Sequence, residues 1–341
     1  MWLGESRDDL EQVIASGRGK GVNAVVSAHT IRGLASPVDS TKGMDKLEQL
    51  VRKADVVHLH NVMNPVALEV VAKSGKGVVT VQDHRVFCPS RGKVLPSGKI
   101  CELPMSKELC AGCFDDLDYG ERTLSLTERR LKAIRSMSVI VLSSYMAREL
   151  RQLGVESRVI APGVVAAQKP SEVGEGYLIG GRVVSHKGHS MAVDAWRMSG
   201  VESALKVAGE GPELASLDGV EQLGWLSKPE LTTALRAARA LIFPSDWQEP
   251  FGILGVEALA QGTPVVAIRT GGIEDWSQEG VVLVERTAIE SMAEAIRELE
   301  SDPVLVASLG SRGHGWVAEQ LSPKERWGEV LEVYSDLTRG N

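Results

Sequence analysis

Short runs rich in Val and Ile alternate with longer amphipathic stretches along almost the whole chain, and this alternation constrains the fold most. Strands that are buried on both faces read as apolar runs, whereas the helices that cover them keep a helical period. The expected strands are residues 22–27, 55–60, 77–82, 138–142, 158–161, 177–180, 204–208, 220–223, 238–243, 264–268 and 281–284. The expected helices are residues 44–53, 65–73, 124–135, 145–153, 189–196, 228–237, 253–261, 288–300 and 323–337. The pattern predicts an α/β protein with doubly wound parallel sheets.

The length predicts two domains. A chain of 341 residues is too long for one hydrophobic core, and an apolar content of 43% is enough to build two. Residues 162–176 lack a periodic pattern and are bracketed by Pro and Gly, so we expect them to be the interdomain linker. The expected division is residues 1–165, residues 166–321 and a last helix within residues 322–341.

The composition argues against a nucleic-acid partner. Only 4% of the residues are aromatic, and 38 basic against 45 acidic residues give a formal charge of −7. Such a chain has neither a platform for stacking bases nor a global basic field. There is no run of 18 apolar residues and no signal pattern at the N-terminus, so a cytoplasmic protein is expected.

The strongest chemical motif is residues 244–260, in which Glu249 and Glu257 lie eight residues apart across a loop-to-helix junction. At 3.6 residues per turn, Glu257 is expected a little over two turns beyond Glu249. Phe251, Gly252 and Ile253 would present free backbone N–H groups at the start of the helix, where phosphate binds well. Amides for phosphate and carboxylates for hydroxyls predict a phosphorylated, polyhydroxylated ligand.

A second motif, residues 180–188, follows an expected strand and opens a helix. Its two cations, Arg182 and Lys187, are five residues apart and can flank a diphosphate. The alternative is a solvated Arg and Lys in a turn. A third motif, residues 207–212, is a strand end with a glycine-rich turn, and a need for positive φ at Gly209 or Gly211 would also explain its glycines.

Residues 243–275 resemble the Glu-x7-Glu signature of the retaining GT-B glycosyltransferases, most closely the large family 4 group, the glycosyl transferases group 1. The resemblance implies two Rossmann-like domains that face a central cleft with the ligand in it. Residues 1–165 would take the acceptor side and residues 166–321 would bind the nucleotide-sugar donor. The last helix would return to pack on the first domain.

The resemblance also implies roles for single residues. Arg182 and Lys187 would bind the donor diphosphate and steady the leaving group, next to Gly181 and aided by the amides at residues 251–253. Glu257 would bind the ribose hydroxyls and Glu249 the transferred sugar, while Gly209 would lie beside the base and ribose. The acceptor oxygen would attack from the face of the leaving group, and neither a metal ion nor another cofactor is required.

In the first half, residues 81–89 resemble the strand-end His-Asp…Cys-Pro element of many relatives, with Gln82 at the usual position of the His. Asp83 is a candidate for contact with the transferred sugar or the acceptor. His58 is expected to be a buried, hydrogen-bonded histidine. His60 is expected at the edge of the sheet where ligands bind in open α/β folds.

All four cysteines, Cys88, Cys101, Cys110 and Cys113, fall in an insertion at residues 85–120, which is expected to cap the acceptor side. Cys110 and Cys113 have metal-ligand spacing, but twelve residues separate the first pair. Loop cysteines without metal are the expectation, and a structural zinc is the alternative. A cytoplasmic setting disfavours disulfides.

The N-terminus departs from the family pattern of strand, glycine-rich loop and helix. Residues 1–6 are followed by an expected helix from Arg7 to Ser16, so the first domain is expected to lack its first strand. Either the start is internal to the true reading frame or another segment covers the gap.

The predicted function is that of a retaining glycosyltransferase, which moves a hexose-type sugar from a nucleotide diphosphate sugar to a hydroxyl of a glycan, lipid-linked sugar or metabolite. A lipid-linked acceptor would bring peripheral contact with a membrane. The alternatives are a non-catalytic relative that acts as a nucleotide-sugar-binding or assembly subunit, and another GT-B enzyme such as a phosphorylase or an epimerase. The nucleotide base, the sugar and the acceptor are not determined by these motifs. An oxidoreductase is disfavoured because no G-x-G-x-x-G follows a strand.

Overall fold

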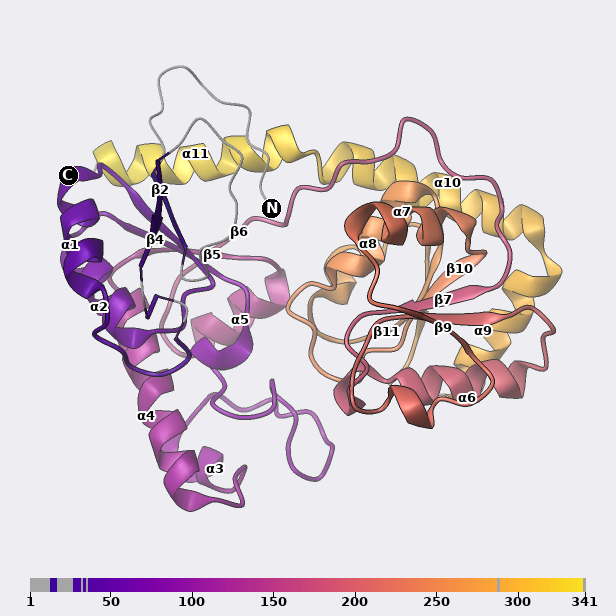
Figure 1. Cartoon of the computed structure of the whole chain (residues 1–341), viewed down its shortest axis with the longest axis horizontal. Helices are drawn as coiled ribbons and strands as arrows, with labels where there is room; N and C mark the ends of the chain where they lie inside the picture. The colour runs from indigo at the N-terminus through magenta and orange to yellow at the C-terminus, as the bar shows by residue number, and fades with distance from the viewer. Residues whose placement is uncertain (1–12, 17–26, 32, 35, 287–288, 340–341) are drawn as a thin grey trace. The chain divides into compact units, whose positions relative to one another are not determined.

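The computed structural model describes residues 13–16, 27–31, 33–34, 36–286 and 289–339. The chain divides into two compact units (Figure 1). Unit 1 comprises Met1–Ala161 and Arg326–Asn341, and unit 2 comprises Pro162–Glu325. The sequence-based division lies at 165/166 and 321/322, within four residues of these boundaries. No helix in the described part of the chain is long and apolar enough to cross a bilayer.

Unit 1 is built on a parallel sheet with the order β3-β4-β5-β6. Its strands are β3 (Val57–His60), β4 (Gly77–Val81), β5 (Ser138–Val141) and β6 (Arg158–Val159). A second sheet consists of β1 (Val13–Ser16) and β2 (Ser27–Thr30), which are also parallel.

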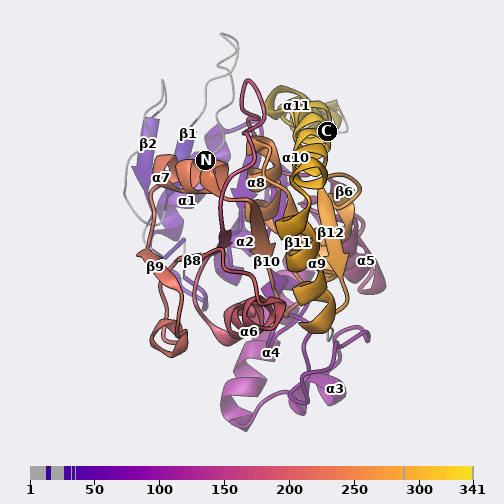
Figure 2. The same cartoon turned by 90° about the vertical axis from the view of Figure 1, so that its right-hand side faces the viewer.

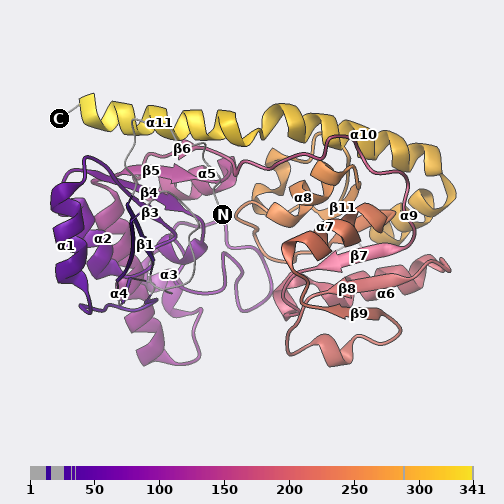
Figure 3. The ribbon, with the colours of Figure 1, turned by 45° about the horizontal axis from the view of Figure 1, so that its top comes forward.

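Helices cover both faces of the four-stranded sheet in unit 1, because successive side chains of a strand point to opposite faces. Val79 and Val81 share one core with α1 (Met44–Lys53), α2 (Pro65–Lys73), α4 (Leu117–Ile134) and α5 (Ser144–Gln152). Val78 and Ile140 face the other way and pack against Val330 and Val333 of α11 (Pro323–Arg339), which runs along this face in Figure 3.

Unit 2 contains a parallel sheet with the order β12-β11-β10-β7-β8-β9. Its strands are β7 (Tyr177–Gly180), β8 (Leu205–Ala208), β9 (Glu221–Gly224), β10 (Ala240–Phe243), β11 (Val265–Ile268) and β12 (Val281–Val284). The chain builds outward from β7 to β9, then returns to β10 on the other side of β7 and continues to β12 (Figure 2). The strand order therefore reverses between β7 and β10, and ligands of open α/β sheets bind at such a switch point.

Two helical layers enclose the sheet of unit 2 (Figure 1). One layer is formed by α6 (His189–Ser199) and α9 (Ile289–Ser301), which bury Ile179, Val207, Ile242 and Val266 with them. The other layer is formed by α7 (Lys228–Ala237), α8 (Ile253–Gln261) and α10 (Pro303–Gln320). The shorter helical elements of the chain are α3 (Lys107–Ala111), η1 (His84–Val86), η2 (Ser185–Lys187), η3 (Leu214–Ser216) and η4 (Gly271–Asp275).

The α/β fold with two parallel sheets is confirmed, and so are the bounds of the helices predicted at residues 44–53, 65–73, 228–237 and 253–261. Each of these segments is amphipathic or is bordered by a Pro, a Gly or a capping residue, so the local pattern was sufficient to predict its bounds. The segment at residues 162–176 packs onto unit 2 through backbone hydrogen bonds, among them Ala167 N–H to Ala260 O at 2.9 Å and Glu175 N–H to Ala237 O at 2.9 Å.

The helix predicted from Arg7 to Ser16 is wrong for Val13–Ser16, which form β1. The β-branched pair Val13-Ile14 suits a strand, and the parallel pairing with β2 supplies the long-range partner that a local pattern cannot show. β1 and β2 form a sheet separate from that of β3, and the expected absence of a first strand stays a prediction. Residues 1–12 lie outside the described residues, as does most of the strand predicted at 22–27, although Ser27 begins β2.

Helix α10 was not predicted, and its glycines explain why. Gly310, Gly313 and Gly315 lower the intrinsic helix propensity of the segment. In the structure, a Cβ on Gly310 would lie 2.1 Å from the carbonyl oxygen of Gly262, and one on Gly313 would lie 2.7 Å from a methyl of Leu259. Close packing on α8 requires the two glycines, so tertiary contact overrides propensity here.

His58 is hydrogen-bonded inside unit 1, as predicted. Its Nδ1 lies 2.7 Å from the hydroxyl of Tyr334 on α11, and its Nε2 lies 2.7 Å from the hydroxyl of Thr80 on β4. Burial, and then the neighbouring His60 whose ring centroid is 4.0 Å away, lower the pKa of His58 from 6.5 to about 2. His58 is thus a neutral link between the sheet and α11.

Unit 1 is expected to lose stability as the pH falls below 6.5, because unfolded His58 then binds a proton that the folded form does not. The loss should approach about 1.4 kcal/mol per pH unit for this one group. Urea unfolding between pH 7 and pH 5, followed by circular dichroism, measures it. His58→Gln should flatten the pH dependence, whereas Tyr334→Phe should keep the slope and lower stability by about 1 kcal/mol at every pH. Equal slopes for His58→Gln and the unchanged protein would contradict the assignment.

Candidate functional site

The candidate site lies at the carboxyl edge of the unit 2 sheet, which we define as the edge where β7, β8, β10 and β11 end. The loop at residues 244–252 follows β10 and is tied to both neighbouring strand ends. The N–H of Asp246 donates to the carbonyl of His186 at 3.0 Å, and the N–H of Gly272 donates to the carbonyl of Glu249 at 2.7 Å. The loop is therefore held at the switch point between β7 and β10 and beside the end of β11.

Glycines let the successive strand-end loops touch backbone to backbone. A Cβ on Gly209, after β8, would lie 1.8 Å from the carbonyl oxygen of Gly181, after β7. One on Gly188, before α6, would lie 1.9 Å from the oxygen of Pro244, after β10. One on Gly271, after β11, would lie 2.2 Å from the oxygen of Glu249. These separations exclude any side chain, so each glycine is needed for close approach.

This packing corrects the expectation of positive φ at Gly209 or Gly211, since neither is among the positive-φ glycines. A Cβ on Gly211 would lie 2.1 Å from the carbonyl oxygen of Val183. The contacts favour a structural reason for both glycines. Gly181 differs, because it has a φ of 113° and no atom lies within 4 Å of its ideal Cβ position.

Lys187 and Glu249, predicted to bind different parts of a donor, form an ion pair with each other. The Oε1 atom of Glu249 accepts a hydrogen bond from the Lys187 ammonium and another from the Ser245 hydroxyl. The Lys187 Nζ also lies 4.9 Å from the ring centroid of Trp247. Glu249 is only 4% exposed, so its charge depends on these partners.

Arg182 lies directly after β7 and Gly181, and its side chain is exposed. Among the described residues it forms no ion pair or hydrogen bond through its guanidinium group. An exposed guanidinium group of this kind is suited to hydrogen bonds with anions.

Two histidines flank Lys187 and are held neutral. Burial, and then the charge of Lys187, lower the pKa of His189 to about 4. The same two causes, joined by Arg182, lower the pKa of His186. Positive charge at neutral pH therefore resides on the lysine and the arginine, and not on the imidazoles.

Helix α8 begins at Ile253, so Glu257 lies just over one turn into the helix, and Glu249 lies in the loop before it. The expectation of two helical turns between the carboxylates is wrong, because Gly252 with φ 88° precedes the first helical residue. No side chain caps this helix end. Glu257 is ion-paired with Lys228, the first residue of α7.

The side chain of Trp276 packs against the start of α8. Its side chain is fully buried, and its indole N–H donates to the carbonyl of Phe251, whose own side chain is also buried. A Cβ on Gly255 would lie 2.2 Å from the indole ring. Sequence reasoning missed Trp276, Ser245 and Lys228, since nothing local indicates that they contact the predicted residues.

The other two candidate residues, Asp83 and His60, belong to unit 1. Asp83 caps η1 and accepts hydrogen bonds at 2.9 Å from the backbone N–H and the guanidinium of Arg85. Burial raises the pKa of Asp83, but the hydrogen bonds and charge of Arg85 outweigh burial and leave it below its usual value. His60 ends β3 with an exposed side chain.

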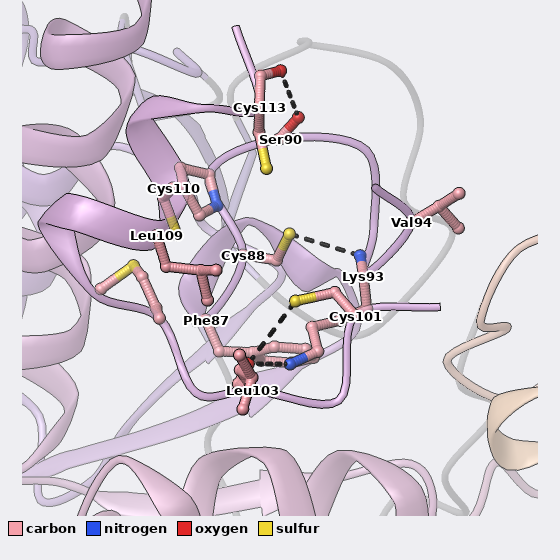
Figure 4. Close-up of a pocket in the computed structure, with 12 residues that line it drawn as sticks. Phe87, Cys88, Ser90, Lys93, Val94, Cys101, Leu103, Leu109, Cys110 and Cys113 are labelled. Carbon is pink, nitrogen blue, oxygen red and sulfur yellow. Dashed lines mark hydrogen bonds between the residues drawn. The ribbon is translucent and has the colours of Figure 1, made fainter. Parts of the chain in front are cut away.

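The four cysteines are free thiols. They line one pocket in unit 1, together with Lys93 and Leu109 (Figure 4). Burial raises the pKa of Cys88, Cys110 and Cys113. As the side chains are oriented, the described residues contain no group of three or more His, Cys, Asp or Glu that could hold a metal ion.

Residues 169–316 match the family of glycosyl transferases group 1. D-inositol 3-phosphate glycosyltransferase 1 of Catenulispora acidiphila is 42% identical over 120 residues, which cover 33% of this chain and 27% of that protein. The chain spans between 25% and 47% of the length of three curated relatives that it matches.

Two solved structures are similar over most of this chain. Anabaena Alr3699/HepE in complex with UDP has a TM-score of 0.67 at 17% identity, covering 91% of this chain and 86% of that one. Sucrose-phosphate synthase from Thermosynechococcus elongatus has a TM-score of 0.66 at 19% identity, covering 92% and 84%. These likenesses show the GT-B fold. The match of residues 169–316 to the glycosyl transferases group 1 agrees with the resemblance seen in the sequence.

Gly209→Ala should destabilise unit 2 by about 3 kcal/mol, because the new methyl group would overlap the carbonyl of Gly181. Gly315→Ala is the matched control, since nothing lies within 4 Å of its Cβ position in α10. The free energy of unfolding of the control should rise by about 1 kcal/mol, because Ala has a higher helix propensity than Gly. Urea unfolding measures both, and a Gly209→Ala protein as stable as the unchanged one would contradict the close approach.

Lys187→Met should lower the free energy of unfolding by about 3 kcal/mol, because it leaves the buried carboxylate of Glu249 without its cation. In a double-mutant cycle, the same change in a Glu249→Gln background should cost much less. Lys206→Met is the control, since its ion pair with Glu221 is exposed and should contribute no more than about 1 kcal/mol. Urea unfolding of the four cycle proteins gives the coupling, and additive losses would show that the two charges do not interact.

Proposed function

We propose that the chain is a retaining glycosyltransferase that moves a hexose-type sugar from a nucleotide diphosphate sugar to a hydroxyl acceptor. One observation carries the proposal: Arg182, which has no ion pair in the described part of the chain, lies at the switch point of unit 2 with the Lys187–Glu249 pair and the uncapped start of α8. The match of residues 169–316 to the glycosyl transferases group 1 supports it.

The donor diphosphate is assigned to Arg182 and to the free N–H groups at the start of α8. A planar guanidinium and backbone amides both suit phosphate oxygens. Lys187 adds a second positive charge next to Arg182 and is positioned by Glu249 and Trp247. Charge that develops on the departing diphosphate is then met by groups that are already in place, which is an effective way to lower the barrier.

The sugar rings are assigned to the two carboxylates. Both contacts of Glu249 end on Oε1, so Oε2 is the oxygen that we assign to a hydroxyl of the transferred sugar. Glu257 is assigned to the ribose hydroxyls, with Lys228 holding its carboxylate in place. As the bond to the diphosphate breaks, the sugar gains oxocarbenium character. The acceptor hydroxyl attacks from the face that the diphosphate leaves, and the diphosphate helps to take its proton.

The proposed classes of donor and acceptor are based on what the similar proteins are named for or hold. The Anabaena protein holds UDP, and the Catenulispora protein is named for D-inositol 3-phosphate. We therefore propose a nucleotide diphosphate sugar as donor and a hydroxyl of a glycan, lipid-linked sugar or metabolite as acceptor, with unit 1 carrying Asp83 and His60 on the acceptor side. The competing hypothesis is a non-catalytic relative that binds the nucleotide sugar without turnover.

Purified protein should be stabilised by one or more members of a panel of UDP-, GDP- and ADP-sugars, and should hydrolyse or transfer that sugar. Thermal shift finds the donor, because a ligand of the folded state raises the melting temperature. Arg182→Ala should lower kcat/KM about a hundredfold, because it removes positive charge from the departing diphosphate. Its unfolding free energy should not change, since the side chain has no ion pair to lose among the described residues.

Glu249→Gln should also reduce turnover strongly, whereas Glu294→Gln, an exposed carboxylate on α9, is the matched control and should match the unchanged protein. Binding of a donor without hydrolysis or transfer to any acceptor tested would favour the non-catalytic subunit. If no member of the panel bound by calorimetry, the proposed donor class would be wrong.

A further inference from the structure

The four cysteines belong to a segment that we call the cysteine segment, residues 88–113. They come from three separate parts of it. Cys88 follows η1, and Cys101 follows a small hairpin closed by the bridge between Val94 and Ile100. Cys110 lies in the short helix α3, and Cys113 follows its C-cap. All four nevertheless line the same pocket (Figure 4).

The cysteine segment has almost no hydrophobic core of its own. From Val94 to Leu109 no residue is buried, and Leu103 is 58% exposed. Short segments that cannot bury enough apolar surface are usually held by a covalent or metal cross-link. The chain supplies four thiols at this place and no cysteine elsewhere.

The turn after Cys88 is shaped around its sulfur. Gly92 and Lys93 both have positive φ, at 63° and 64°, and the second is unusual for a residue with a side chain. This conformation lets the N–H of Lys93 donate to Cys88 Sγ at 3.3 Å. Hydrogen bonds to ligand atoms from surrounding groups orient the ligands of metal sites.

Lys93 anchors this turn to the rest of unit 1. Its side chain is buried, and its ammonium group lies 2.9 Å from a carboxylate oxygen of Glu149 on α5 and donates to the carbonyl of Leu103. The Cys101 N–H donates to the carbonyl of Lys93 at 2.8 Å. One buried lysine thus contacts both the sulfur of Cys88 and the backbone of Cys101.

We propose that Cys88, Cys101, Cys110 and Cys113 bind one structural Zn²⁺ with four thiolate ligands. Four sulfurs in tetrahedral geometry are a closed site, and soft thiolates favour Zn²⁺ over the hard divalent cations. Cys110 and Cys113 have the spacing of a ligand pair on one turn. On binding, each thiol releases its proton to solvent and no electron is transferred.

The Cys101 Sγ lies 3.7 Å from the carbonyl oxygen of Leu103, as a donor does, so this sulfur is turned toward the backbone. A change of rotamer about the single side-chain bond of a cysteine moves its sulfur by roughly 3 Å. We therefore assign metal binding to rotation of the cysteine side chains around the pocket that they line.

A zinc ion would link the separate parts of the cysteine segment, whereas a disulfide between Cys110 and Cys113 would not. Such a disulfide closes a loop within one helical turn and places no constraint on Cys88 or the hairpin. The metal joins η1, the hairpin and α3 at one point. It would thereby fix the cysteine segment relative to the end of β4, which lies just before Asp83 and η1.

The test is metal analysis of the full chain, purified without chelator, equilibrated with Zn²⁺ and passed through a desalting column. We expect about one zinc per chain by mass spectrometry of the elements, as the closed four-ligand site requires. Cys101→Ser and Cys110→Ser should each lower the content roughly tenfold or more. Lys99→Ala, at the exposed tip of the hairpin, is the control and should keep the full content.

Two further readouts do not depend on whether the variants fold. Replacement by Co²⁺ should give the visible bands of a tetrahedral site with four sulfur ligands, and a chelator should free four thiols and lower the melting temperature. Iron in place of zinc, a disulfide found by peptide mapping under non-reducing conditions, or zinc retained equally by all variants would each overturn the proposal. Less than a tenth of a zinc per chain after equilibration would do the same.

Discussion

The site of unit 2 depends on backbone contact between successive loops at its carboxyl edge. Gly209 lies against the loop after β7, Gly188 against the end of β10, and Gly271 against the carbonyl of Glu249. Each contact leaves no room for a Cβ, so the loops are packed as closely as their backbones permit. This packing places the loop after β10 where its side chains can meet those of the loop after β7.

The buried ion pair of Lys187 and Glu249 follows from that closeness. One partner comes from the loop after β7 and the other from the loop after β10, on the two sides of the switch point. Burying a carboxylate is unfavourable unless it is paired and hydrogen-bonded, and Lys187 and Ser245 satisfy both conditions. Arg182 has no ion pair among the described residues, and this free charge is the basis on which we propose an anionic ligand for the site.

Unit 1 shows different means of holding a segment in place. The neutral His58 links the sheet to α11 through Tyr334, and the buried Lys93 links the cysteine segment to α5. Both are polar links inside apolar surroundings, so each is specific to its partner. The cysteine segment lacks an apolar core, and this lack is the physical reason for a metal cross-link.

The sequence by itself determined the fold class, most strands and the bounds of four helices, because apolar periodicity and capping signals are local. It also predicted Arg182, Lys187, Glu249 and Glu257 as site residues, since their spacing relative to expected strand ends is readable along the chain, and their roles stay a prediction. Only the tertiary structure decided how these charges are paired, that Val13–Ser16 form a strand, and that the glycines of α10 pack against α8. Contacts between residues that are far apart in the chain determine these features, and no local pattern shows which distant groups will meet.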